Sequence, residues 1–120
     1  MTDHTLNRNE RLRLKRQIEC LFEQGRSVRS FPIRTIWTDI PYDGADVRML
    51  VSVPKKHFKH AVDRNLVKRR IRAAYRENKH LLVPNGQTRL FAFVCITKQL
   101  PCYAEIASAV RAAMEKIYVG

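Results

Sequence analysis

Residues 63–76 read DRNLVKRRIRAAYR and place six basic side chains among apolar ones. An α-helix turns by about 100° per residue, so this spacing sorts the side chains onto faces. One side is largely apolar: Val67, Ile71, Ala74 and Asn78, with Tyr75 at its edge. The opposite side is a cationic ridge: Asn65, Lys68, Arg69, Arg72 and Arg76, while Arg64 and Arg70 flank the apolar stripe. The stretch predicts a helix over 61–80 that packs by one face and exposes cations on the other.

The cationic ridge has the charge pattern of a surface that meets a polyanion. A helix face that is merely solvated usually mixes both signs at i,i+4 spacing, which gives small pairing energies. Here Arg72 follows Lys68 and Arg69 and precedes Arg76, so cation stands beside cation. A bound polyanion would relieve that repulsion, and arginine suits forked contacts to phosphate. The ridge therefore favours nucleic-acid binding over a solvated face.

The composition of the whole chain supports the same partner. The 120 residues are 45% hydrophobic, enough for a single domain over 1–120, in which we expect residues 1–9 to be disordered. Twenty-three Lys and Arg against eleven acids give a net charge of +12. No apolar run approaches the roughly 20 residues of a membrane helix, and the N-terminus lacks an apolar signal-peptide core. We expect a cytoplasmic protein without membrane contact.

The three cysteines, Cys20, Cys95 and Cys102, are odd in number and form no CxxC pair. This pattern argues against a disulfide framework and against a zinc knuckle. A reducing compartment fits best, with the thiols acting as small core residues.

Apolar patterns outside 61–80 complete the fold prediction. Helical spacing recurs in two stretches, 10–24 and 102–118, and Gly25 is a natural stop for the first. Strand patterns occur in three: 31–37, 47–53 and 89–97, the last nearly continuous as in a central strand. Alternation puts Phe31, Ile33, Thr35 and Trp37 on one face, and Val47, Met49, Val51 and Val53 on one face. Turns are expected at PYDG, 41–44, and PNG, 84–86. The fold class is α/β, an α+β two-layer sandwich with a small mixed sheet.

The basic stretch also resembles a known family. Its RN..KR.IR spacing, preceded by SVPKKHFKHAV, is similar to the basic helix of the bacterial ribonuclease P protein component. The matching residues are Ser52, Lys55, Lys56, Ala61, Val62, Arg64, Asn65, Lys68, Arg69, Ile71 and Arg72. ERL and LFEQGRS resemble the first helix and following turn of that family, so the resemblance spans roughly 10–117. Three features depart from it: Leu66 at the third position of the Arg-Asn-Arg signature, Ile18 where an aromatic is common, and three strand runs against four. Pro32 would divide the first run into two.

The resemblance implies a cofactor-like role. In that family a catalytic RNA, with Mg²⁺ bound mainly by the RNA, removes the 5′ leader of precursor tRNA, and the small protein assists. The residues implied to bind the ribonuclease P RNA are Lys55, Lys56, Arg64, Asn65, Lys68, Arg69, Arg72 and Arg76. A cleft between the first helix and the sheet would hold the leader of the precursor tRNA, with Arg11, Lys15, Arg16, Phe31, Arg34 and Trp37 as its candidates. Core packing is the competing interpretation of Phe31 and Trp37. No protein oligomer is required.

Nothing in the sequence predicts a catalytic or metal-binding residue in the chain itself. The acids are scattered, and His57 and His60 stand among lysines that would repel a metal cation. Other RNA-binding modules remain alternatives: a ribosomal protein, or a double-stranded-RNA-binding domain, whose key lysines begin its last helix. Here the last helix is nearly neutral. A transcription factor would need base-reading amides and a dimer surface, and neither is visible.

Overall fold

The computed structural model describes residues 15–81 and 86–119 of the chain. The elements are α1 (Lys15–Gln24), β1 (Arg26–Ser30), β2 (Ile33–Pro41), β3 (Val47–Ser52), α2 (Ala61–Asn78), the 3₁₀ helix η2 (Lys79–Leu81), β4 (Gln87–Cys95) and α3 (Tyr103–Val119). The predicted order of helix, strands, helix, strand and helix is confirmed. The expectations for residues 1–9, for the helical start 10–14 and for most of the turn 84–86 lie outside the described residues.

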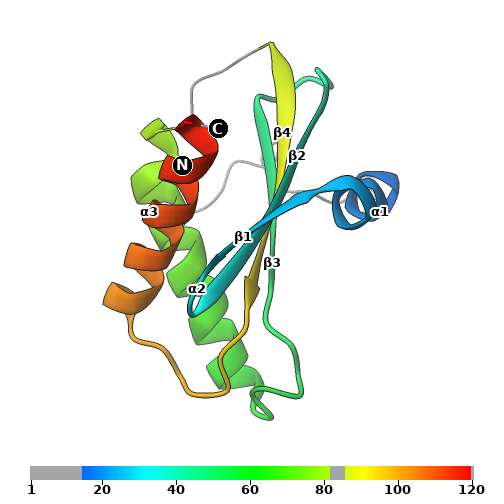
Figure 1. The fold of residues 1–120 in the computed structure, drawn as a ribbon. Coiled ribbons are helices and arrows are strands. Elements are labelled where there is room, and N and C mark those ends of the chain that lie inside the picture. Colours follow the sequence, from blue (N-terminus) through cyan, green and yellow to red (C-terminus); the bar gives the residue numbers. More distant parts are fainter. Residues whose placement is uncertain (1–14, 82–85, 120) are drawn as a thin grey trace, which may run out of the picture.

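The four strands form one mixed sheet in the order β1-β2-β4-β3. β2 pairs antiparallel with β1 and with β4, whereas β3 runs parallel to β4, and α2 connects those two parallel strands. α2 and α3 cover one face of the sheet, and α1 lies against the other (Figure 1). The α+β class and the small mixed sheet are confirmed.

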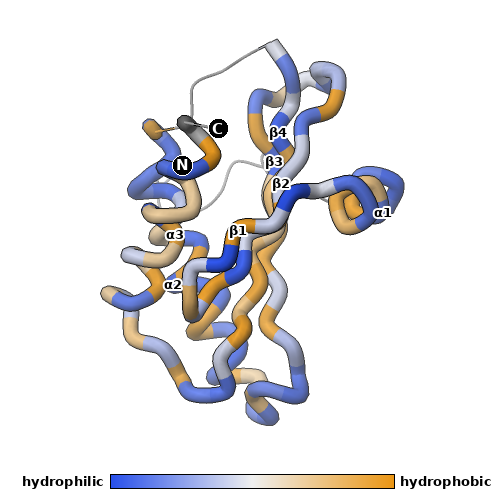
Figure 2. The backbone as a smooth tube through the Cα atoms, viewed as in Figure 1, coloured by the Kyte–Doolittle hydropathy of each residue, from blue (hydrophilic) through white to orange (hydrophobic). Residues whose placement is uncertain are grey.

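The main core lies between the sheet and the pair α2 and α3. The predicted apolar face of α2 is fully buried: Val67, Ile71, Ala74, Tyr75 and Asn78. α3 buries its own stripe, Ile106, Val110, Ala113 and Ile117. Asn78 is tolerated there because its side-chain amide donates to the Ala74 carbonyl at 2.9 Å. β4 occupies the predicted central position, and Figure 2 shows hydrophobic residues concentrated along the central strands.

A second, smaller cluster attaches α1 to the other face of the sheet: Leu21, Ile36, Leu90 and Ala92. Gly25 ends the helix, and its N–H donates to the Leu21 carbonyl at 2.8 Å. A Cβ at Gly25 would collide with that carbonyl oxygen and lie 2.6 Å from the Cγ2 of Ile36. The missing side chain at Gly25 therefore sets how closely α1 approaches β2.

The turn between β2 and β3 contacts α1 near its start, at the end of the helix opposite Gly25. The Asp43 carboxylate accepts hydrogen bonds from the Gln17 amide of α1, from Nε of Arg48 at 2.8 Å and from the Thr88 hydroxyl at 3.0 Å. Burial opposes ionisation of Asp43, but these hydrogen bonds outweigh it and lower the pKa of its carboxyl. A residue expected only in a turn thus connects α1, the turn and β4.

The structure contains one strand that the sequence pattern did not predict. β1 has a single apolar residue, Val28, and forms an edge of the sheet. Phe31 and Pro32 form the turn between β1 and β2, so the strand expected over 31–37 begins only at Ile33. The break at Pro32 agrees with a four-stranded sheet, but the extra strand precedes the predicted run instead of being cut from it.

The cysteines do not all lie in the core. Cys95 is buried, and burial raises the pKa of its thiol. Cys20 is half-buried, and Cys102 is exposed just before α3, so the core assignment is wrong for Cys102. Over residues 15–81 and 86–119, no helix has the length and apolar character that crossing a membrane requires.

Candidate nucleic-acid interface

The cationic ridge follows α2 on the side away from its buried stripe. Asn65 and Arg69 are exposed, and Lys68, Arg72 and Arg76 are half-buried. The helix separates the two faces as its spacing predicts, because residues three and four apart stack on one side. Only Asp63 and Glu77 bring negative charge to this helix. The ridge is therefore strongly positive along its length.

The loop before α2 extends the positive surface beyond the helix. Lys55 and Lys56 are exposed, whereas Phe58 is 6% exposed and anchors the loop in the main core. Arg64 reaches back from the first turn of α2 and donates to the carbonyls of Phe58 at 2.9 Å and Lys59 at 3.0 Å. These hydrogen bonds fix the loop lysines beside the start of the ridge.

Two arginines that flank the apolar stripe have structural partners. Arg64 holds the loop, as described, and Arg70 donates to the carbonyl of Pro101 at 2.7 Å. That bond ties α2 to the segment that leads into α3. The side chain of Arg70 therefore points toward the segment before α3.

A row of residues crosses the whole sheet on the side where α1 lies. The strand register aligns Arg29 with Arg34, Arg34 with Val94, and Val94 with Ser52. Both arginines are exposed, and Nε of Arg34 donates to the Ser27 hydroxyl at 2.8 Å. Like charges directly opposite on neighbouring strands repel each other. This α1-side row (Arg29, Arg34, Val94, Ser52) is a second place where an anion would relieve repulsion.

α1 contributes exposed groups next to that row. Lys15 and Arg16 are exposed in its first turn, and Lys15 lies 3.9 Å from Glu19 in a solvent-exposed pair. Ile18 is half-buried against the small cluster. Phe22 follows Ile18 at i,i+4 spacing, which is typical of a packed stripe, but it is 50% exposed. The sequence does not indicate this exposure, because Phe22 is as apolar as its buried neighbour Leu21 and fits the same helical pattern.

The remaining leader candidates are divided between different parts of the fold. Arg11 lies outside the described residues. Phe31 is 63% exposed in the turn between β1 and β2. Trp37 is 9% exposed and packs in the main core, on the sheet face that α2 and α3 cover. Trp37 therefore does not meet Arg34, which faces the α1 side, and core packing is its main role.

The described residues offer binding groups but no clustered acid–base chemistry. No three His, Cys, Asp or Glu side chains among them gather as metal ligands. Burial and the nearby Glu77 carboxylate raise the pKa of the Tyr103 phenol to about 12. The cationic ridge and the α1-side row are suited to contacting phosphates, and they lie on different sides of the sheet.

Comparison with known proteins identifies relatives over nearly the whole chain. Residues 6–118 match the family model described as Ribonuclease P. A ribonuclease P protein component of Porphyromonas gingivalis is 37% identical over 117 residues, which cover 93% of this chain and 85% of that protein. One from Petrotoga mobilis is 41% identical over 81 residues, covering 66% of this chain and 64% of that protein.

Solved structures share the fold. The RNase P protein from Thermotoga maritima has a TM-score of 0.72 at 21% identity, and the match covers 89% of this chain and 96% of that one. An RNase P protein from Staphylococcus aureus has a TM-score of 0.66 at 21% identity, covering 90% and 94%. The length of the family match, together with the identity to the Porphyromonas protein, decides the assignment: the chain belongs to the ribonuclease P protein family.

Proposed function

We propose that this protein binds the catalytic RNA of ribonuclease P through the cationic ridge and through the loop before α2 that carries Lys55 and Lys56, here called the lysine loop. The observation that carries the proposal is the continuity of these two positive surfaces. Arg64 and the buried Phe58 fix Lys55 and Lys56 next to the ridge, so a single run of phosphates would meet both. Phosphate contacts position an RNA without reading its sequence, which suits a large folded partner.

The 5′ leader of precursor tRNA is the second ligand in this proposal. The α1-side row supplies two guanidinium groups and a half-buried apolar residue, Val94, between them and Ser52. Lys15, Arg16 and the exposed ring of Phe22 lie on α1. Bases of a single strand gain about 1–3 kcal/mol each by stacking on aromatic rings, without strong preference among bases. Because the cationic side chains outnumber this one exposed ring, the leader would be held mainly by charge.

The chemistry in this proposal belongs to the RNA, with Mg²⁺ bound mainly by the RNA. Mg²⁺ sites in phosphoryl-transfer enzymes use carboxylates together with phosphate oxygens. The described part of the chain presents cations near the ridge and the row, and its carboxylates do not gather into a ligand set. The protein's contribution is to neutralise phosphate repulsion between the catalytic RNA and the substrate, a task otherwise left to added magnesium.

The test is cleavage of precursor tRNA by a bacterial ribonuclease P RNA, measured over a range of Mg²⁺ concentrations with and without this protein. The protein should lower the Mg²⁺ concentration that gives half-maximal rate, and the protein alone should cut nothing. Site-specific, magnesium-dependent cleavage by a nucleic-acid-free preparation would contradict the assignment of the chemistry to RNA. An unchanged Mg²⁺ requirement would contradict the assisting role.

A further inference from the structure

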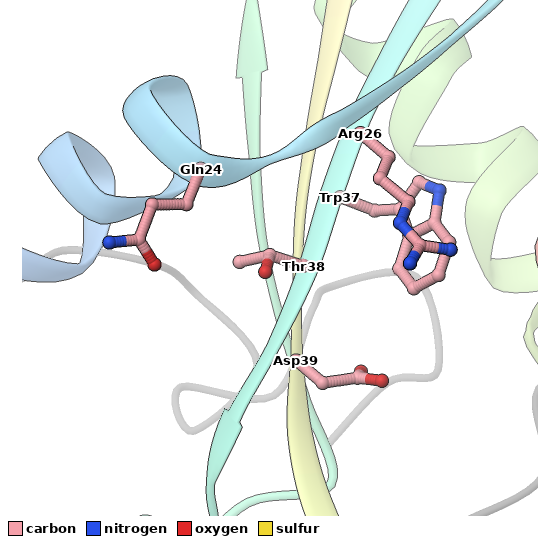
Figure 3. A pocket seen from close by; sticks show the side chains of 5 residues that line it. All are labelled: Gln24, Arg26, Trp37, Thr38 and Asp39. Atoms are coloured by element: carbon pink, nitrogen blue, oxygen red, sulfur yellow. The ribbon is translucent and has the colours of Figure 1, made fainter.

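A pocket of about 430 Å³ lies where α1 passes into β1, at the edge of β2. Its lining residues are Gln24, Arg26, Trp37, Thr38 and Asp39 (Figure 3). β1 starts at Arg26, opposite Trp37, so β2 from Thr38 onward pairs with β4 on one side only. Within the described residues, no strand pairs with the other side of that segment. The pocket therefore opens at an unpaired stretch of strand edge.

Trp37 forms the aromatic wall of this pocket. The guanidinium carbon of Arg26 lies 5.6 Å from the centre of the Trp37 ring, and that of Arg89 lies 5.9 Å from it. Figure 3 shows the Arg26 side chain lying over the ring. Trp37 is nearly buried while Arg26 is exposed, so the guanidinium group of Arg26 is the surface that a ligand meets. An arginine held in this way offers a planar, cationic stacking surface.

The rest of the lining is polar and mixed in charge. Asp39 lies 3.3 Å from Nε of Arg89, and its side chain is 24% exposed. Gln24, at the end of α1, and Thr38 add an amide and a hydroxyl group from the other side of the strand (Figure 3). The guanidinium plane of Arg26 beside the carboxylate of Asp39, both on one side of the strand, matches the flat face and polar edge of a nucleobase (Figure 3). Unpaired bases are commonly recognised by stacking on arginine planes and by hydrogen bonds to their edges.

We propose that this pocket binds one unpaired base of single-stranded RNA. The base stacks on Arg26, and its polar edge faces Asp39, which lies on the same side of the strand (Figure 3). A carboxylate accepts hydrogen bonds from an exocyclic amino group, so bases that carry one (adenine, cytosine, guanine) are preferred over uracil. The site lies apart from the α1-side row, because Trp37 and Arg34 face opposite sides of the sheet. It adds a single base-reading contact to a protein whose other proposed RNA contacts are mainly to phosphate.

The inference rests on the proposed function only for the source of the base, and it is tested on the free full-length protein. Trp37 is the single tryptophan of the chain, so its fluorescence reports directly on this pocket. The titrants are CMP, UMP, ribose 5-phosphate, and single-stranded hexamers of cytidine and of uridine. We expect quenching by CMP and by the cytidine hexamer, about tenfold weaker binding of the uridine counterparts, and no quenching by ribose 5-phosphate.

Variants separate stacking from general charge. Arg26→Gln should weaken binding of the cytidine hexamer about tenfold. Its matched control is Arg111→Gln, which removes the same charge from an exposed position on α3, an element that lines neither the pocket nor the α1-side row. Asp39→Asn should abolish the preference for the cytidine hexamer over the uridine hexamer. Gln24→Leu changes an exposed residue on the other side of the strand and should leave that preference unchanged. If Asp39→Asn fails to fold, Arg26→Gln and the nucleotide titrations still decide the proposal.

Four outcomes would overturn the proposal: no quenching by any nucleotide, equal quenching by ribose 5-phosphate, equal losses in Arg26→Gln and Arg111→Gln, or quenching by CMP without quenching by the hexamer. The last would identify a free nucleotide as the ligand in place of RNA. Loss of assembly in variants of the cationic ridge bears on the proposed function instead, and leaves the Trp37 signal unchanged.

Discussion

Asp43 shows how one side chain fixes the position of a helix. Its carboxylate accepts from Gln17, Arg48 and Thr88, three groups that lie far apart in the sequence. Hydrogen bonds to a charged group contribute about 1.5–3 kcal/mol each when partly sheltered, and an unpaired partner costs a similar amount. The separation of α1 from the sheet, and with it the access to the α1-side row, depends on this residue.

Asp43→Asn should destabilise the protein by about 1–3 kcal/mol at neutral pH. The folded-state pKa of Asp43 is lowered from 3.8, so its stabilisation is present above the unfolded-state pKa. It is lost as the pH falls through the lower folded-state pKa. Urea unfolding at several pH values should therefore show the largest difference between the two proteins above about pH 4, with the difference shrinking in stronger acid. A difference that grows on acidification would contradict this account.

Gly25 matters because it has no Cβ, which leaves room for α1 to approach β2 closely. Gly25→Ala should cost about 1–3 kcal/mol, because the new Cβ meets the Leu21 carbonyl and the Ile36 side chain and α1 must move. The measurement is thermal or urea unfolding, with Glu23→Ala, an exposed change on the same helix, as the control. If Gly25→Ala is as stable as Glu23→Ala, the close approach of α1 to β2 does not constrain the fold.

At the residue scale, the sequence predicted local chemistry better than distant partners. PYDG correctly indicated a turn, but nothing in those letters shows that Asp43 meets Gln17, 26 positions away. Alternation put Ile33, Thr35 and Trp37 on one face, which the register confirms. It did not show which face, because both sides of β2 carry apolar residues and both are covered by helices.

Among the elements, α2 is the one that the sequence specifies most completely. Its buried and cationic residues are separated by helical spacing along the whole helix, so one pattern sets both its conformation and its orientation. β1 is the opposite case. Arg26 to Ser30 contains one apolar residue and becomes a strand because β2 offers it an unpaired edge. A strand that depends on its neighbour in this way leaves little trace in its own sequence.

The ridge of α2 should be dispensable for folding and needed for RNA. The double variant Arg69→Ala with Arg72→Ala should weaken binding of the ribonuclease P RNA and flatten its salt dependence, since each phosphate contact that disappears removes about 0.7–0.9 from the log–log slope. Both residues lie away from the buried Val67 and Ile71, so unfolding should barely change.

The matched control for the ridge lies on α3. Arg111→Ala with Lys116→Ala removes two exposed cations from another helix and should leave the salt slope nearly unchanged. Equal flattening in both double variants would mean that the RNA responds to net charge alone. Unfolding of the ridge variant with an unaltered slope would mean that the ridge is structural.

At the scale of the whole molecule, the sheet separates two cationic surfaces. The ridge belongs to α2 on one face, whereas the α1-side row lies on the other, where no helix besides α1 is packed among the described residues (Figure 1). The lysine loop runs between them, from the end of β3 to the start of α2. Cationic surfaces on two sides of the sheet fit the proposed assisting role, in which the protein contacts the catalytic RNA and the leader at once.

Arg34 tests that arrangement, because it lies on the α1 face of the sheet, whereas the ridge belongs to α2 on the other face. Arg34→Ala should weaken binding of precursor tRNA by the assembled ribonucleoprotein about tenfold, the effect of removing one charge-assisted hydrogen bond. Affinity for mature tRNA, which has no leader, should stay nearly constant at the same salt concentration. Arg34 is exposed, and the substitution also removes its hydrogen bond to the Ser27 hydroxyl at the protein surface, so stability should change little.

The ratio of the two affinities is the decisive quantity in this experiment. Arg111→Ala on α3 serves as the control for the removal of one positive charge, and it should leave both affinities as they are. Changing the leader bases should have little effect on the weakening caused by Arg34→Ala, because backbone charge carries no sequence information. Equal weakening for precursor and mature tRNA would mean that Arg34 meets the body of the tRNA or the catalytic RNA. The leader would then have to be placed elsewhere on the protein.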